Sequence, residues 1–142
     1  MSDNHIKLEI EAKSENTSLA RVVAAAFITP YDATVGEISD IKTAVSEAIT
    51  NAIIHGYADS PGIVTMTLSA KDSTITINVS DSGVGIENIQ SAMEPLFTTK
   101  PEMERSGLGF TVMESFMDKI EVASTPGAGT SVTMTRKLGI SK

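Results

Sequence analysis

Apolar and polar side chains alternate in five short segments of the chain, and this alternation predicts five β-strands. The clearest case is residues 6–12, where Ile6, Leu8 and Ile10 alternate with charged residues. The other predicted strands cover residues 64–69, 74–79, 119–124 and 130–136. A turn at Lys71-Asp72-Ser73 joins the second and third of these strands into a hairpin. Because each strand has one polar side, one face of the sheet is expected to contact water.

Apolar residues at helical spacing predict three helices. The first covers about 15–29, ends before Pro30, and has Ser14 and Asn16 as possible N-terminal caps. The third covers about 107–118. The buried stripe predicted for the first helix contains Leu19, Val22, Val23, Ala26 and Phe27.

The second predicted helix is the longest and covers about 35–55. Thr34 and Glu37 have the spacing of a capping box at its start. Gly56 stands where a left-handed residue closes a helix. Its predicted buried positions are Ile38, Ile41, Val45, Ala48, Ile49 and Ala52.

These elements together predict an α+β fold, a two-layer sandwich in which a mixed, mostly antiparallel sheet carries helices on one face. We find no linker or internal repeat, so a single domain over residues 1–142 is expected. Residues 81–106 contain many turn formers and predict a long loop with a short helix. A loop of this length in a compact domain usually has a function.

Composition narrows the possible functions. Eleven Lys and Arg against eighteen Asp and Glu give a net charge of −7, the opposite sign to that of a protein that binds many phosphates of a nucleic acid. With no cysteine and two histidines, thiolate catalysis and Cys-based or multi-His zinc sites are excluded. No apolar run is long enough to span a membrane and no signal peptide opens the chain, so a cytoplasmic protein with no membrane partner is expected.

One polar face of the second helix has residues suited to a magnesium-phosphate site. Glu47, Asn51 and His55 are spaced at i, i+4 and i+8 and therefore share a face. An Asn oxygen suits Mg²⁺, and a Glu can accept a proton from a hydroxyl beside a metal-bound phosphate. An ordinary solvated helix face has the same pattern, so the spacing alone is not specific.

Glycine-bearing segments offer further candidate sites, although the chain has neither a P-loop nor a G-x-G-x-x-G sequence. Asp81-Ser-Gly-Val-Gly85 follows a strand, where the Asp could accept from a purine amine and the glycines would let the backbone approach the ring. Arg105-Ser-Gly-Leu-Gly109 opens a helix and could bind an anion. Gly127-Ala-Gly-Thr130 fits a hairpin connection. Taken singly, these segments also fit a turn, a helix entry and a hairpin.

The order of these segments resembles the GHKL family, whose Bergerat-type ATP-binding fold occurs in histidine-kinase catalytic domains and gyrase-type ATPases. Within this family the chain is most similar to the small anti-sigma factor serine kinases. Arg105 stands where the histidine kinases have a glycine, which favours the anti-sigma kinases. The resemblance covers nearly the whole chain and is carried by Ser14-Glu-Asn16, Leu19-Ala-Arg21, Ser46 to Gly56, Asp81 to Ile86, Pro95 to Pro101 and Glu104 to Glu114.

The resemblance implies a role for each part of the site. Asn51 would ligate Mg²⁺ on the phosphates of ATP or ADP, and Glu47 would be the base that acts on the attacking hydroxyl. Asp81 would accept from the adenine amine. The resemblance implies that Gly83 and Gly85 lie beside the ring and that Thr130 assists from the last strand. A lid over the phosphates would contain Thr98, Thr99, Lys100 and Arg105. The helix start would contain Ser106, Gly107, Leu108 and Gly109. Arg105 would also stabilise charge that develops during transfer.

The resemblance also implies protein partners. The chain would bind and inhibit a sporulation sigma factor and use Mg-ATP to phosphorylate the anti-anti-sigma antagonist on serine, as a homodimer. Arg21, with Glu15 and Asn16, would lie on the surface that the two partners share. Thr17 stands where relatives have an acidic residue, which would alter that contact. Two alternatives stay open: a nucleotide-gated binding module without significant kinase activity, and the general-stress anti-sigma serine kinase.

Overall fold

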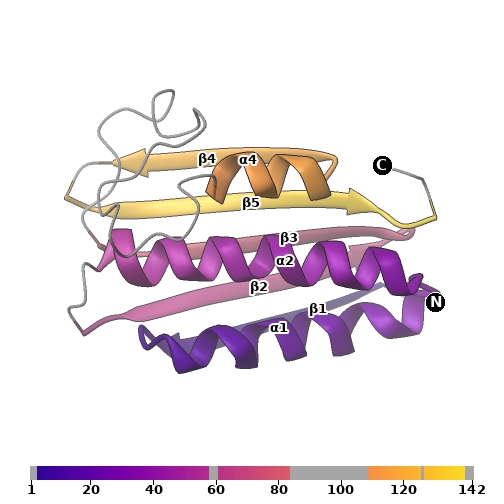
Figure 1. Cartoon of the computed structure of the whole chain (residues 1–142), viewed down its shortest axis with the longest axis horizontal. Coiled ribbons are helices and arrows are strands. Elements are labelled where there is room, and N and C mark those ends of the chain that lie inside the picture. Colours follow the sequence, from indigo (N-terminus) through magenta and orange to yellow (C-terminus); the bar gives the residue numbers. More distant parts are fainter. Residues whose placement is uncertain (1–2, 58–60, 84–108, 126, 140–142) are drawn as a thin grey trace.

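The computed structural model describes residues 3–57, 61–83, 109–125 and 127–139 and forms two layers (Figure 1). The strands pair in the order β1-β2-β3-β5-β4, and every described pair is antiparallel. They are β1 (Asn4–Glu11), β2 (Ile63–Lys71), β3 (Thr74–Asp81), β4 (Lys119–Thr125) and β5 (Gly129–Lys137). The helices α1 (Glu15–Ile28), α2 (Val35–Asn51) and α4 (Gly109–Phe116) lie on one face of the sheet. The predicted α+β sandwich is confirmed.

The hairpin between β2 and β3 is the tightest connection in the sheet. Asp72 and Ser73 are its two loop residues and have φ values of 50° and 63°. Two positive φ values in a two-residue loop match the twist of the flanking strands. Lys71 therefore belongs to β2, paired with Thr74, and not to the turn as predicted.

The core lies between the sheet and the helices. Alternate residues of β2 and β3 are buried, as the sequence predicted. The helix that covers them is α2, which contacts α1 on one side and α4 on the other. The largest fully buried side chains of these three elements are Met66 and Leu68 of β2, Ile75 and Ile77 of β3, and Ile41 and Ile49 of α2.

The buried stripe of α1 differs from the prediction. Leu19 is 47% exposed and Val22 is 62% exposed, whereas Ala20 and Ala24 are fully buried. Alanines let α1 approach α2 closely, and they displace the larger residues toward solvent. Of the predicted stripe, Phe27 is buried and Val23 is partly buried. The predicted caps are also absent. Ser14 makes no side-chain capping bond, and the side-chain amide of Asn16 donates to the backbone carbonyl of Glu11.

The start of α2 is capped as predicted. The Thr34 hydroxyl accepts from the Glu37 amide at 3.0 Å, and the Glu37 carboxylate accepts from the Thr34 amide at 2.9 Å. The end of the helix is different. Residues Ala52–Gly56 form a π-helix, η2, which is followed by Tyr57 in a right-handed conformation. The prediction that Gly56 closes this helix as a left-handed cap is therefore wrong.

Candidate functional site

The end of α2 places two candidate residues at one end of the sheet. Glu47 and Asn51 lie one turn apart in the last part of α2, and both are partly buried. The following π-helix η2 contacts β3 and β5. Figure 1 shows α2 ending at the end of the sheet where β3 ends and β5 begins. The polar end of this helix therefore lies near the strand ends that have Asp81 and Thr130.

Asp81 is the last residue of β3 and is held by the turn that follows it. Its Oδ1 accepts from the Gly83 amide at 2.8 Å. Burial raises the pKa of Asp81 above its ordinary value of 3.8, although hydrogen bonds from the Gly83 and Thr130 amides act in the opposite direction. The carboxylate is thus a partly desolvated acceptor in a fixed orientation, which suits recognition of an amine donor.

The start of β5 packs tightly against this turn. Thr130 pairs with Asp81 across the two strands, and its hydroxyl lies 2.9 Å from the Ser124 hydroxyl. Gly129 has a φ of 114°, and a Cβ there would overlap the Asp81 carbonyl. A side chain at this position would therefore force the turn away from β5. Gly129, the second glycine of Gly127-Ala-Gly-Thr130, therefore lets β5 approach the turn closely. The interpretation of this segment as a hairpin connection did not include that contact.

Several predicted site residues lie outside the described part of the chain. They include every predicted lid residue and most of the predicted helix start. These residues are Gly85, Thr98, Thr99, Lys100, Arg105, Ser106, Gly107 and Leu108. Gly109 is described and is the first residue of α4. The described structure therefore brings together the predicted adenine side and the end of α2.

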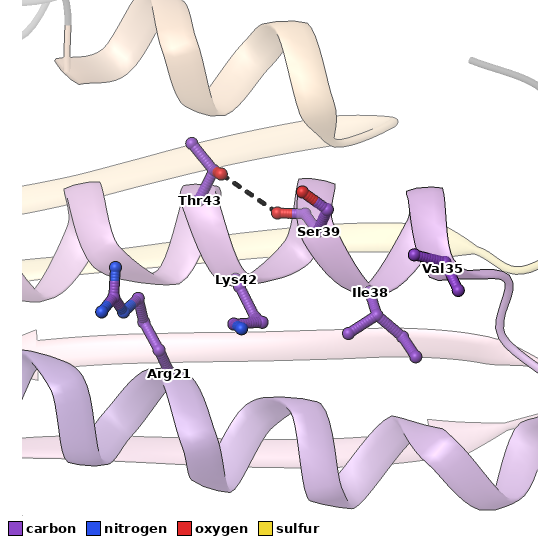
Figure 2. A pocket seen from close by; sticks show the side chains of 6 residues that line it. All are labelled: Arg21, Val35, Ile38, Ser39, Lys42 and Thr43. Atoms are coloured by element: carbon purple, nitrogen blue, oxygen red, sulfur yellow. Dashed lines mark hydrogen bonds between the residues drawn. The ribbon is translucent and has the colours of Figure 1, made fainter.

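The predicted partner residues lie on α1, which packs against the side of α2 opposite α4. Arg21 is exposed and lines a groove of about 320 Å³ between α1 and α2 (Figure 2). Glu15 is also exposed, but the side chain of Asn16 is engaged with Glu11. The remaining residues that line the groove come from α2: Val35, Ile38, Ser39, Lys42 and Thr43.

Sequence reasoning did not single out Tyr57 and Gly62, although both contribute to this end of the sheet. The Tyr57 hydroxyl accepts from the Ser82 amide at 2.9 Å, and the ring packs against Gly62. An aromatic residue after a helix has no motif that would have marked it. A contact between residues 25 positions apart is visible only in the fold.

Two features are absent from the part of the chain that the structure describes. None of the described helices combines the length and hydropathy needed to cross a bilayer. The described residues also contain no group of three His, Cys, Asp or Glu side chains arranged to hold a metal ion.

Comparison with solved structures supports the fold. The RsbU and RsbW domains of a Mycobacterium tuberculosis protein align with a TM-score of 0.68 at 19% identity, covering 95% of this chain and 32% of that one. The catalytic domain of the histidine kinase ThkA aligns with a TM-score of 0.57 at 18% identity, covering 97% of this chain and 98% of that one.

Sequence comparison is more specific. Residues 10–136 match the histidine kinase-like ATPase domain. The anti-sigma F factor of Clostridium acetobutylicum is 54% identical over 140 residues, covering 99% of this chain and 98% of the relative. The anti-sigma F factor of Thermoanaerobacter pseudethanolicus is 55% identical over 139 residues, covering 98% and 97%. The chain therefore belongs to the histidine kinase-like ATPase family, and within that family to the anti-sigma F factors.

Proposed function

We propose that the end of the sheet formed by the end of α2, the Asp81 turn and the start of β5 binds Mg-ATP and Mg-ADP. The observation that carries this proposal is the oriented, partly desolvated carboxylate of Asp81, which is fixed by Gly83. An acceptor of this kind recognises the exocyclic amine of adenine and rejects a base without that donor. Membership of the ATPase family supports the assignment.

The donor set at the end of α2 fits magnesium held mainly by phosphates. Asn51 offers one hard neutral oxygen, and Mg²⁺ is commonly held by one or two protein oxygens together with substrate phosphates. Bound in this way, Mg²⁺ neutralises charge on the phosphates. Asn51 would hold and orient the metal, while the Asp81 turn holds the base.

Glu47 supports a kinase more than a passive nucleotide sensor. It lies one helical turn before Asn51. In our proposal its carboxylate accepts the proton of a serine hydroxyl that attacks the terminal phosphate. In our proposal the chain transfers that phosphoryl group to a serine of an anti-anti-sigma protein, with Arg105 stabilising the developing charge. A nucleotide-gated module would need no such base.

A phosphotransfer assay separates these two functions. Purified chain, radiolabelled ATP and the anti-anti-sigma protein should yield labelled partner. The variant Glu47→Gln should bind ATP as the original chain does and give no labelled product. Glu9→Gln, which changes an exposed glutamate on β1, is the matched control and should label normally. Labelling by Glu47→Gln at the original rate would remove Glu47 from the mechanism, and no labelling by the original chain would favour the gated module.

We further propose that the α1 surface around Arg21 binds sigma F and the antagonist. Val22, the next residue along the helix, is 62% exposed and gives this part of α1 an apolar component beside the charge of Arg21. Arg21→Ala should weaken sigma binding and leave ATP affinity unchanged, with Lys71→Ala in the β2–β3 hairpin as the control. A pull-down with sigma F and a general-stress sigma factor, each with ATP or ADP, distinguishes the two anti-sigma functions.

A further inference from the structure

The hydroxyl of Tyr57 joins three segments at the proposed nucleotide site. It donates to the carbonyl of Ile63, the first residue of β2, and accepts from the amide of Ser82 at 2.9 Å. Tyr57 itself directly follows η2, the π-helix that extends α2 beyond Asn51. One side chain therefore connects the end of α2, the start of β2 and the turn after β3.

The bond to Ser82 fixes the part of the turn that orients Asp81. The Gly83 amide is already used by the Asp81 carboxylate, so the Ser82 amide is the other backbone donor of this turn. On the opposite side, Gly129 packs against the Asp81 carbonyl and the Ser82 Cα. The peptide between Asp81 and Ser82 is thus held between Gly129 and the Tyr57 hydroxyl.

The position of Tyr57 depends on two local features. Its amide bonds to the carbonyl of Ala52, which is the i to i−5 pattern of a π-turn. Such turns are often found at functional sites. The aromatic ring lies against Gly62, where a Cβ would overlap three atoms of the ring. Only a residue without a side chain at position 62 leaves room for the ring.

We propose that Tyr57 is a positioning residue for adenine recognition, because its hydroxyl sets the Asp81 turn against the helix end that has Asn51. This inference rests on the proposed function, since it concerns the same site. This role of Tyr57 predicts an effect that depends on which nucleotide base is bound. Loss of the hydroxyl loosens the Asp81 carboxylate, so discrimination between adenine and a base without the exocyclic amine decreases.

The test is calorimetric titration of Tyr57→Phe with Mg-ATP and with Mg-ITP, because inosine lacks the amine that Asp81 would accept. The original chain should prefer ATP. In Tyr57→Phe the ATP affinity should fall about fivefold while the ITP affinity stays the same, as expected for loss of one neutral hydrogen bond. Tyr31→Phe, at the opposite end of α2, removes the only other tyrosine hydroxyl and should leave both affinities unchanged.

Each outcome has a definite meaning. Equal losses of ATP and ITP affinity, or no change in either, would overturn the positioning role of Tyr57. A failure of the original chain to bind ATP would instead overturn the proposed function, and this inference with it. If Tyr57→Phe does not fold, Gly62→Ala carries the test, because the added methyl displaces the ring; it should reduce the preference for ATP in the same way.

Discussion

Arg136 on β5 and Asp40 on α2 form an ion pair between the sheet and the helix layer. The Arg136 Nη1 lies 3.2 Å from the Asp40 Oδ2, and the two side chains are 3% and 31% exposed. The same guanidinium nitrogen donates to the carbonyl of Phe116 at the end of α4. Arg136 thus connects β5 with α2 and α4, the two helices that would approach a bound nucleotide.

Asp40→Ala should therefore lower the free energy of unfolding by about 2 kcal/mol, because it removes a charged hydrogen-bond partner and leaves Arg136 buried with less compensation. Urea unfolding monitored by circular dichroism measures this change. The control is Glu121→Ala, which breaks the exposed pair between Lys119 and Glu121 and should cost less than about 0.5 kcal/mol. Equal effects of the two variants would show that burial of Arg136 does not strengthen its pair.

The two N-terminal caps offer a matched comparison. Thr34→Ala removes the hydroxyl that caps α2 and should lower the free energy of unfolding by about 1 kcal/mol. Ser14→Ala changes the corresponding position of α1, where no side-chain capping bond exists, and should cost less than about 0.5 kcal/mol. Thermal and urea unfolding of both variants measure the difference. A larger loss for Ser14→Ala would contradict the capping assignment.

Glu37 makes stability depend on acid pH. Its burial raises the pKa, but the amides of Thr34 and Gly139, the Thr34 side chain and the charge of Arg136 outweigh burial and leave the pKa below 4.5. The folded state therefore favours the ionised form. This stabilisation is complete above pH 4.5 and is lost as the pH falls through the lowered pKa.

Glu37→Gln should consequently reduce stability at pH 7, and the difference from the original chain should shrink as the pH falls below 4.5. Urea unfolding midpoints at several pH values measure both effects. A difference that stays constant, or grows, as the solution is acidified would show that ionised Glu37 does not stabilise the fold.

Asp81 titrates in the opposite direction. Burial raises its pKa above 3.8, so the charged form is less favourable in the folded chain than in the unfolded one. Asp81→Asn removes that cost and should not lower stability at neutral pH through this effect. The variant should nevertheless bind ATP at least tenfold more weakly. The side-chain NH2 group of Asn would face one of the hydrogen-bond donors that now point at the carboxylate, and that donor would lose its acceptor. Titrations at pH 7, with a melting curve for each protein, measure both quantities.

Acidification supplies a second readout for Asp81. The nucleotide affinity of the original chain should fall as Asp81 becomes protonated. Because the pKa of Asp81 is raised, this fall should begin at a higher pH than for an aspartate with the ordinary pKa of 3.8. The affinity of Asp81→Asn for the same nucleotide should not show this fall. Parallel pH profiles for the two proteins would contradict a role for the ionised carboxylate.

Local chemistry made much of the fold predictable. Thr34 and Glu37 have capping-box spacing, and both bonds of the box are present. The alternation in β2 and β3 predicted the strands because alternate residues, from Val64 to Ala70 and from Ile75 to Val79, are buried. Asp81 was identified because a turn with glycine follows its strand, and the Gly83 amide does bond to its carboxylate.

Other features depend on contacts between distant segments. The buried face of α1 was misassigned because Leu19 and Val22 are more hydrophobic than Ala20 and Ala24, although close packing on α2 selects the smaller residues. The π-turn after Asn51 has no sequence signal. The contact of Tyr57 with Ser82 likewise exists only once α2 and β3 end at the same side of the sheet.

Titration of the intact chain with Mg-ATP in a calorimeter tests the central claim most directly. One nucleotide should bind per chain with measurable heat, binding should require Mg²⁺ for full affinity, and Asp81→Asn should weaken it. Absence of heat, together with an unfolding temperature that does not rise when Mg-ATP is added, would contradict the account and remove both the kinase and the nucleotide-gated alternative.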